Sequence, residues 1–169
     1  MSDQYRFSFG PWNISSGADP FGPPSRKEVA IAEKLKLYRE LGFEGIQFHD
    51  DDAVANLEEL SPQQIADEAK KIKKVYDDHG LVAEFVAPRL WEDPRGVDGG
   101  YTANDPAARQ WALDRTKRAI DIAAALGTRM IVLWLAREGT YIRESKCAKT
   151  SYDRILDAVN AMLAYNPEI

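Results

Sequence analysis

The chain has 169 residues, of which 44% are hydrophobic and 29% are charged, and its formal net charge is −5 at pH 7. This composition is typical of a globular protein with one core, so we expect a single domain over residues 1–169. The mild negative charge argues against a surface that binds nucleic acid.

The sequence also favours a reducing compartment. The chain has one cysteine, Cys147, which cannot form a disulfide within the chain. The N-terminal segment MSDQYRFSFG has neither the basic start nor the apolar stretch of a signal peptide. No apolar run approaches the ~20 residues that are needed to cross a bilayer. We therefore expect a cytoplasmic protein that has no membrane partner.

Short apolar runs alternate with longer polar segments along the chain. Gly42, Gly80 and Gly127 stand just before three of these runs, where a left-handed residue typically ends a helix. The pattern of helix, glycine and strand therefore repeats. The predicted strands are YRFSF at 5–9, GIQFH at 45–49, AEFVA at 83–87 and MIVLW at 130–134.

Helix starts are marked in the segments between these strands. A serine followed three residues later by Glu or Gln forms a capping box, and a proline suits the first helical position because its missing N–H needs no partner there. The start signals are the boxes Ser25–Glu28 and Ser61–Gln64, the prolines Pro62 and Pro106, and the pair Thr150 and Asp153.

Four strand–helix units predict an α/β fold with a parallel sheet, which is either an open doubly wound sheet or a TIM (β/α)8 barrel. No G-x-G-x-x-G follows the first strand, and a long polar loop stands there instead, which weakens the dinucleotide-binding alternative. A complete barrel needs about 250 residues. We therefore expect only about the first four βα units of a barrel. Because half a barrel leaves sheet edges uncovered, we expect either a fragment or a half that pairs with another half.

The unusual side chains gather where the predicted strands end. Trp12 follows the first strand, His49 ends the second, Trp91 follows the third and Trp134 ends the fourth. Parallel α/β folds place their active sites at this edge. Bulky aromatics can simply close the top of a core, but aromatic walls around a polar centre also suit a sugar.

The segment GIQFHDDD places three aspartates directly after His49. A carboxylate that accepts from the imidazole Nδ1–H leaves Nε2 free to act on a substrate oxygen, and a short turn can bring Asp52 back to do this. Asp50 and Asp51 are expected to shape the turn. A metal site is the competing interpretation, but three adjacent carboxylates cannot converge on one cation from an ordinary turn. We therefore predict no metal ligands here.

Five segments in order closely resemble the N-terminal half of xylose isomerase, of the shorter, actinobacterial-like class. That resemblance implies a (β/α)8 barrel, active as a homotetramer, which uses two divalent cations (Mg, Mn or Co) to move a hydride between C1 and C2 of an opened aldose. The reaction would interconvert D-xylose and D-xylulose. The matching segments are Trp12, DPFG at 19–22, FHDDD at 48–52, DGGYTANDPAARQWAL at 98–113 and W-x-x-REG at 134–139.

The resemblance also implies roles for individual residues. His49 would assist ring opening of the sugar, and Asp52 would orient it. Trp12 and Trp134 would form walls of the sugar pocket. Phe21, from DPFG, would reach into the site of a neighbouring subunit.

The chain departs from the family pattern after the third strand. It reads Arg89, Leu90 and Trp91 where the family usually has N-L-F, so Trp91 replaces a wall phenylalanine and the preferred sugar could differ. The family's metal ligands and catalytic lysine lie beyond residue 169, so we expect the 169-residue chain to be inactive alone. A related sugar isomerase or epimerase and a non-catalytic half-barrel remain the alternatives.

Overall fold

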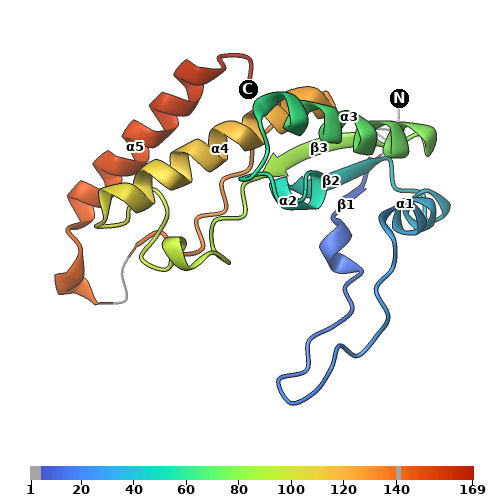
Figure 1. The fold of residues 1–169 in the computed structure, drawn as a ribbon, viewed down its shortest axis with the longest axis horizontal. Coiled ribbons are helices and arrows are strands. Elements are labelled where there is room, and N and C mark those ends of the chain that lie inside the picture. The colour runs from blue at the N-terminus through green and yellow to red at the C-terminus, as the bar shows by residue number, and fades with distance from the viewer. Residues whose placement is uncertain (1–4, 140–141) are drawn as a thin grey trace.

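The computed structural model describes residues 5–139 and 142–169 (Figure 1). Strands and helices alternate along the chain, as the sequence predicts. The strands are β1 (Ser8–Phe9), β2 (Gly45–His49) and β3 (Val82–Ala87). The helices are α1 (Ile31–Glu40), α2 (Asp50–Ala53), α3 (Pro62–Asp78), α4 (Pro106–Leu126) and α5 (Ala148–Tyr165), with short 3-10 turns at η1 (Pro11–Asn13), η2 (Pro94–Gly96) and η3 (Arg143–Ser145).

The three strands form a parallel sheet in the order β1-β2-β3. The fourth predicted strand, at 130–134, is wrong as a strand: Ile131 makes only an isolated parallel bridge to Val86. The Val86 N–H donates to the Met130 carbonyl at 3.1 Å, and the Val132 N–H donates to the Val86 carbonyl at 3.0 Å. The segment pairs along one edge only, because no strand lies on its other side among the described residues, and one bridge does not make a ladder.

The core lies between the sheet and the helices that cover one of its faces (Figure 1). Alternate residues of β2 enter this core, because successive strand side chains point to opposite faces. The register of β3 against β2 shifts between Ala83 and Val86, and these two residues pack into the core. Ile46, Phe48 and Val86 are fully buried there. Gln47 and His49 of β2 and Phe85 of β3 point to the other face, where they are only partly buried and line a cavity. The candidate site therefore lies on the face that these helices leave uncovered.

The predicted helix starts are partly confirmed. Ser61 accepts from the Gln64 N–H as the cap of α3, and Pro62 and Pro106 are the first residues of α3 and α4. The box at Ser25 is wrong, because α1 begins six residues later, at Ile31. The segment before Ile31 is almost wholly exposed and buries no apolar face that would stabilise a helix there.

The last helix begins earlier than Thr150 and Asp153 predict. α5 starts at Ala148, and Asp153 lies inside it, where its carboxylate accepts from the Lys149 ammonium at 2.6 Å. The three predicted helix-ending glycines, Gly42, Gly80 and Gly127, are confirmed by their positive φ angles. Within the described ranges, no helix is both long enough and apolar enough to cross a membrane.

Candidate active site

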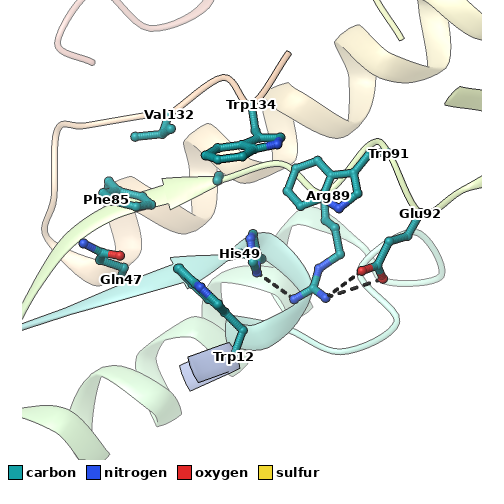
Figure 2. A pocket seen from close by; sticks show the side chains of 10 residues that line it. Trp12, Gln47, His49, Phe85, Arg89, Trp91, Glu92, Val132 and Trp134 are labelled. Atoms are coloured by element: carbon teal, nitrogen blue, oxygen red, sulfur yellow. Dashed lines mark hydrogen bonds and ion pairs between the residues drawn. The ribbon is translucent and has the colours of Figure 1, made fainter. Parts of the chain in front are cut away.

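A cavity of about 420 Å³ opens at the carboxyl ends of β2 and β3 (Figure 2). It collects four of the residues that the sequence singled out: Trp12, His49, Trp91 and Trp134. The polar and apolar side chains around them come from β2, β3, the segment that follows β3 and the segment that follows α4. These additional lining residues are Gln47, Phe85, Ala87, Arg89, Glu92 and Val132.

Two of the three tryptophan rings contact the imidazole of His49, and the third contacts one of these two. The Trp12 ring centroid lies 4.2 Å from that of His49, and the Trp91 centroid lies 5.3 Å from it on an edge-to-face approach. Trp134 lies 6.3 Å from Trp91, ring to ring. Gly10 allows this arrangement, because a Cβ at that position would collide with the Trp12 indole. The three tryptophans therefore form walls of one cavity, as the sequence predicts.

The predicted contact between His49 and Asp52 is confirmed. Nδ1 of His49 lies 2.9 Å from Oδ2 of Asp52. The local fold explains this geometry: His49 is the N-cap of the short helix α2 and Asp52 is its third residue. An acidic residue at that position reaches back to the cap, and the His49 backbone N–H donates to the same Asp52 oxygen at 3.2 Å.

Asp50 does not shape a simple turn, which corrects the expectation for that residue. It is fully buried, and its carboxylate accepts from Nε of Arg115 at 2.7 Å and from Nη2 at 3.0 Å. The backbone N–H of Arg89 donates to the same carboxylate at 3.0 Å. Asp50 therefore ties α4 and the segment after β3 to the end of β2.

Arg89 is the site residue whose role the sequence did not reveal. Its Nη2 donates to Oδ1 of Asp52 at 2.9 Å and lies 2.7 Å from Nδ1 of His49. The sequence marked Arg89 only as a departure from the family pattern. Nothing local places its guanidinium beside a histidine 40 residues earlier in the chain.

The neighbouring aspartates have opposite pKa shifts. Burial alone would raise the pKa of Asp52, but the hydrogen bond from His49 and the positive charge of Arg89 lower it overall. For Asp51, burial and the negative charge of Asp50 raise the pKa, and Arg89 and Arg115 only partly oppose them. The ionised form of Asp52 is therefore more favoured than that of an ordinary aspartate, whereas Asp51 takes up a proton more readily.

These shifts predict opposite effects on acid stability. The ionised form of Asp52 stabilises the fold above its unfolded-state pKa of about 3.9, and this contribution is lost as the pH falls through the lowered folded-state pKa. The raised pKa of Asp51 acts the other way, because stability rises as the pH falls through it. In the full-length protein, Asp52→Asn should flatten the acid loss of stability and Asp51→Asn should steepen it.

Urea unfolding measured from about pH 6 to about pH 2 checks this pair, because the range must extend above the ordinary aspartate pKa for Asp51 and below it for Asp52. If both variants changed the pH dependence of the unfolding free energy in the same direction, the opposite pKa shifts of Asp51 and Asp52 would be wrong.

The DGGYT motif and the REG motif meet in the structure. The carboxylate of Glu138 accepts from the backbone N–H groups of Gly100, Tyr101 and Thr102 at 2.8 to 2.9 Å. Gly99 has a φ of +89°, and an added Cβ there would lie 2.6 Å from Thr102 Oγ1. The two motifs thus join the loop that carries Trp134 to the loop before α4, which is a structural role.

Phe21 does not join the cavity. It is 98% exposed and lies in the long loop between η1 and α1, which extends away from the rest of the fold (Figure 1). Its contact with a neighbouring subunit stays a prediction.

The described residues also offer no ligand set for a cation. Within residues 5–139 and 142–169, no group of three or more His, Cys, Asp or Glu side chains converges on one point. Asp50 and Asp52 are instead engaged by Arg115, Arg89 and His49.

The comparison with known proteins agrees with this architecture. The model of the family described as "Xylose isomerase-like TIM barrel" matches residues 35–168. The chain belongs to this family. Two relatives are xylose isomerases. The enzyme of Thermus thermophilus is 32% identical to this chain over 163 residues, and that of Thermus caldophilus is 32% identical over 166 residues. Each alignment covers 96% of this chain and 42% of the relative, so the chain spans less than half the length of either enzyme.

Solved structures support the barrel fold of this family member. A D-psicose 3-epimerase crystallised in the presence of D-fructose matches with a TM-score of 0.56 at 17% identity, covering 83% of this chain and 44% of that one. The 3-keto-D-glucoside 4-epimerase of E. coli matches with a TM-score of 0.54 at 16% identity, covering 88% and 49%. The predicted fold class, part of a TIM barrel, is confirmed.

Proposed function

We propose that the full-length protein is an aldose–ketose isomerase that interconverts D-xylose and D-xylulose by ring opening and a hydride shift. One observation carries this proposal. His49, bonded to Asp52, lines an aromatic cavity at the carboxyl ends of the strands, in a member of the xylose isomerase-like family. The 32% identity to two xylose isomerases supports the choice of sugar.

The pair is suited to opening a cyclic sugar. Opening a hemiacetal removes a proton from the C1 hydroxyl, forms the C1 carbonyl, breaks the bond from C1 to the ring oxygen and delivers a proton to that oxygen. Nδ1 of His49 is hydrogen-bonded to Asp52, and Nε2 has no protein hydrogen-bond partner among the described residues. Nε2 can therefore accept the hydroxyl proton and return it to the ring oxygen.

The cavity walls suit the same substrate. A pyranose presents C–H groups on its faces and hydroxyls around its edge, so its faces pack on indole rings and its edge needs polar partners. Trp12, Trp91 and Trp134 supply the rings. Gln47 and Glu92 add an amide and a carboxylate to the lining of the same cavity, at its two ends (Figure 2).

We further propose that two divalent cations (Mg, Mn or Co) serve the hydride shift, held by residues outside this chain. Such cations would polarise the C1 and C2 oxygens as Lewis acids. Because the described residues do not fit a cation, we assign no step of the reaction to one here. A cytoplasmic homotetramer in which Phe21 reaches a neighbouring subunit belongs to the same proposal.

The test is a sugar panel on the full-length protein with Mg, Mn or Co added. We expect D-xylose to give D-xylulose as the main product, measured by chromatography of the sugars. Efficient epimerisation of a ketose, with no aldose formed from D-xylulose, would overturn the proposal in favour of a sugar epimerase. Activity on another aldose together with none on xylose would correct the substrate and keep the reaction.

A further inference from the structure

Arg89 is held firmly at the edge of the cavity. Its backbone N–H is bound to the buried carboxylate of Asp50 at 3.0 Å, and its side chain is 17% exposed. The guanidinium extends from the end of β3 toward the imidazole of His49 (Figure 2). A cation in a sugar site could bind an anionic substrate group or act on the neighbouring side chains, and the two roles have different geometries.

The surroundings of Arg89 argue against an anion site. Carboxylates of Asp51, Asp52 and Glu92 lie 2.9, 2.9 and 3.4 Å from its nitrogens. Burial alone would lower the pKa of Arg89, and the nearby charges of Asp51 and Asp52 raise it above its ordinary value instead. A guanidinium surrounded by three carboxylates is already neutralised, and the excess negative charge of these carboxylates would repel a further anion.

Asp52 is the carboxylate that orients the guanidinium. The Nε atom of Arg89 is close to Oδ1 of Asp51, but its N–H does not point at that oxygen, and both atoms lack a hydrogen-bond partner in the described part of the chain. The contacts to the exposed Glu92 are long, at 3.4 and 3.5 Å. The bond from Nη2 to Asp52, at 2.9 Å, is the well-formed side-chain contact.

The two donors use different oxygens of Asp52. Nη2 of Arg89 lies 2.9 Å from Oδ1, and Nδ1 of His49 lies 2.9 Å from Oδ2. The two nitrogens are 2.7 Å apart. At this distance Nη2 either donates to an unprotonated Nδ1, or the two nitrogens lie in close contact as two donors, one on each oxygen of the carboxylate.

The alternative is that Nη2 donates to an unprotonated Nδ1. A guanidinium nitrogen is always a donor, so such a bond needs the lone pair of Nδ1. That lone pair would then also lie 2.9 Å from Oδ2 of an ionised carboxylate, with no proton between them. This contact is repulsive in a partly buried site, so the arrangement with two donors is favoured.

We propose that Arg89 is a positioning residue for His49: it holds one oxygen of Asp52 so that the other accepts the Nδ1 proton, which keeps Nε2 unprotonated and free. Arg89 acts through Asp52 and does not need to touch the sugar. The consequence for catalysis rests on the proposed function, whereas the position of the ring proton does not.

The direct test is NMR of the full-length protein labelled with ¹⁵N-histidine. The His49 signals are those that disappear in His49→Asn, and their ¹⁵N shifts report which ring nitrogen carries the proton. We expect the neutral ring to carry it on Nδ1 in the wild type. We expect a mixture of tautomers in Arg89→Met, which keeps an unbranched apolar stem and loses every donor. Arg89→Lys keeps the charge on a single ammonium donor, so its distribution of His49 tautomers should lie between those of the wild type and Arg89→Met. If Arg89→Met does not fold, Arg89→Lys provides the test.

Kinetics give the second readout. We expect Arg89→Met to lower kcat on a cyclic aldose by about 10- to 100-fold, as for other residues that orient a reactive group, with KM nearly unchanged and partial recovery in Arg89→Lys. The control is Arg95→Gln, which removes a guanidinium bound to Glu58 and Asp93, away from the His49 cavity. It should change neither the tautomer nor kcat.

Three results would overturn the proposal. They are an Nε2–H tautomer in the wild type, a tautomer distribution that both Arg89 variants leave unchanged, and a raised KM at an unchanged kcat, which would make Arg89 a substrate-binding group. If the protein has no isomerase activity, the proposed function fails and the NMR result still decides the role of Arg89.

Discussion

Full-length protein that carries His49→Asn is expected to lose about 10²- to 10⁴-fold of its kcat on a cyclic aldose, which is the usual contribution of a positioned acid–base group. The reason is that ring opening needs a proton acceptor and donor, and Nε2 of His49 is the free imidazole nitrogen in the cavity. An aldose too short to form a ring, such as D-glyceraldehyde, needs no ring opening. The same variant should therefore retain most of its activity on that substrate.

The matched control is the other histidine of this chain. His79 lies at the end of α3, where its Nδ1 bonds to the carbonyl of Val75 at 2.8 Å, and it is absent from the cavity lining. His79→Asn should leave both activities unchanged. Steady-state kinetics on the two substrates distinguish the possibilities, and an equal loss on both in His49→Asn would assign His49 to a different step or to structure.

Asp50→Asn is expected to destabilise the protein by about 3 kcal/mol, because breaking a buried ion pair leaves Arg115 with only its longer contacts to Asp51 and Glu58, at 3.4 and 3.5 Å. Asp50 is 0% exposed and Arg115 is 10% exposed, so water cannot replace the lost partner. The same carboxylate also accepts the backbone N–H groups of Arg89 and Asp51, both at 3.0 Å. Chemical denaturation of the full-length protein measures the effect.

Glu44→Gln is the control for this measurement. Glu44 pairs with Arg6 at 2.7 Å on the surface, where the side chains are 40% and 67% exposed. An exposed ion pair contributes at most about 1 kcal/mol, because solvent screens the charges. If Asp50→Asn and Glu44→Gln lowered the free energy of unfolding equally, burial would not be what makes the Asp50–Arg115 pair strong.

The predictions that held concern residues close together in the sequence. Asp52 reaches His49 because the third residue of a helix lies against its N-cap, whatever the rest of the fold does. The capping box at Ser61 is local in the same way. The strands at 45–49 and 82–87 were predictable because their apolar and β-branched residues suit a buried sheet.

The predictions that failed depended on distant partners. The segment 130–134 has the composition of a buried strand, yet a strand is defined by hydrogen bonds to neighbouring strands. Ile131 forms only an isolated bridge, to Val86. Ser25 and Glu28 have the sequence of a capping box but cap no helix, because a helix also needs an apolar face to bury and the residues around Ser25 are exposed.

Charge pairing in the site was the least predictable feature. Three consecutive aspartates look alike in the sequence, but the structure separates them. Asp50 is neutralised by Arg115 from a helix 65 residues later, and Asp52 is held by Arg89 from the segment after β3. Asp51 lies between these two arginines with a raised pKa. No local pattern assigns these partners, since each depends on how α4 and β3 lie against β2.

The amino-acid sequence was sufficient for the alternation of strands and helices, for the aromatic residues at the strand ends and for the pairing of Asp52 with His49. These features follow from backbone sterics, hydrophobic patterning and contacts within one helical turn. The packed fold was required to bring three tryptophans to the cavity that His49 lines and to place Arg89 on the second oxygen of Asp52. Electrostatic partners are chosen by distance in space and by burial, which only the folded chain sets.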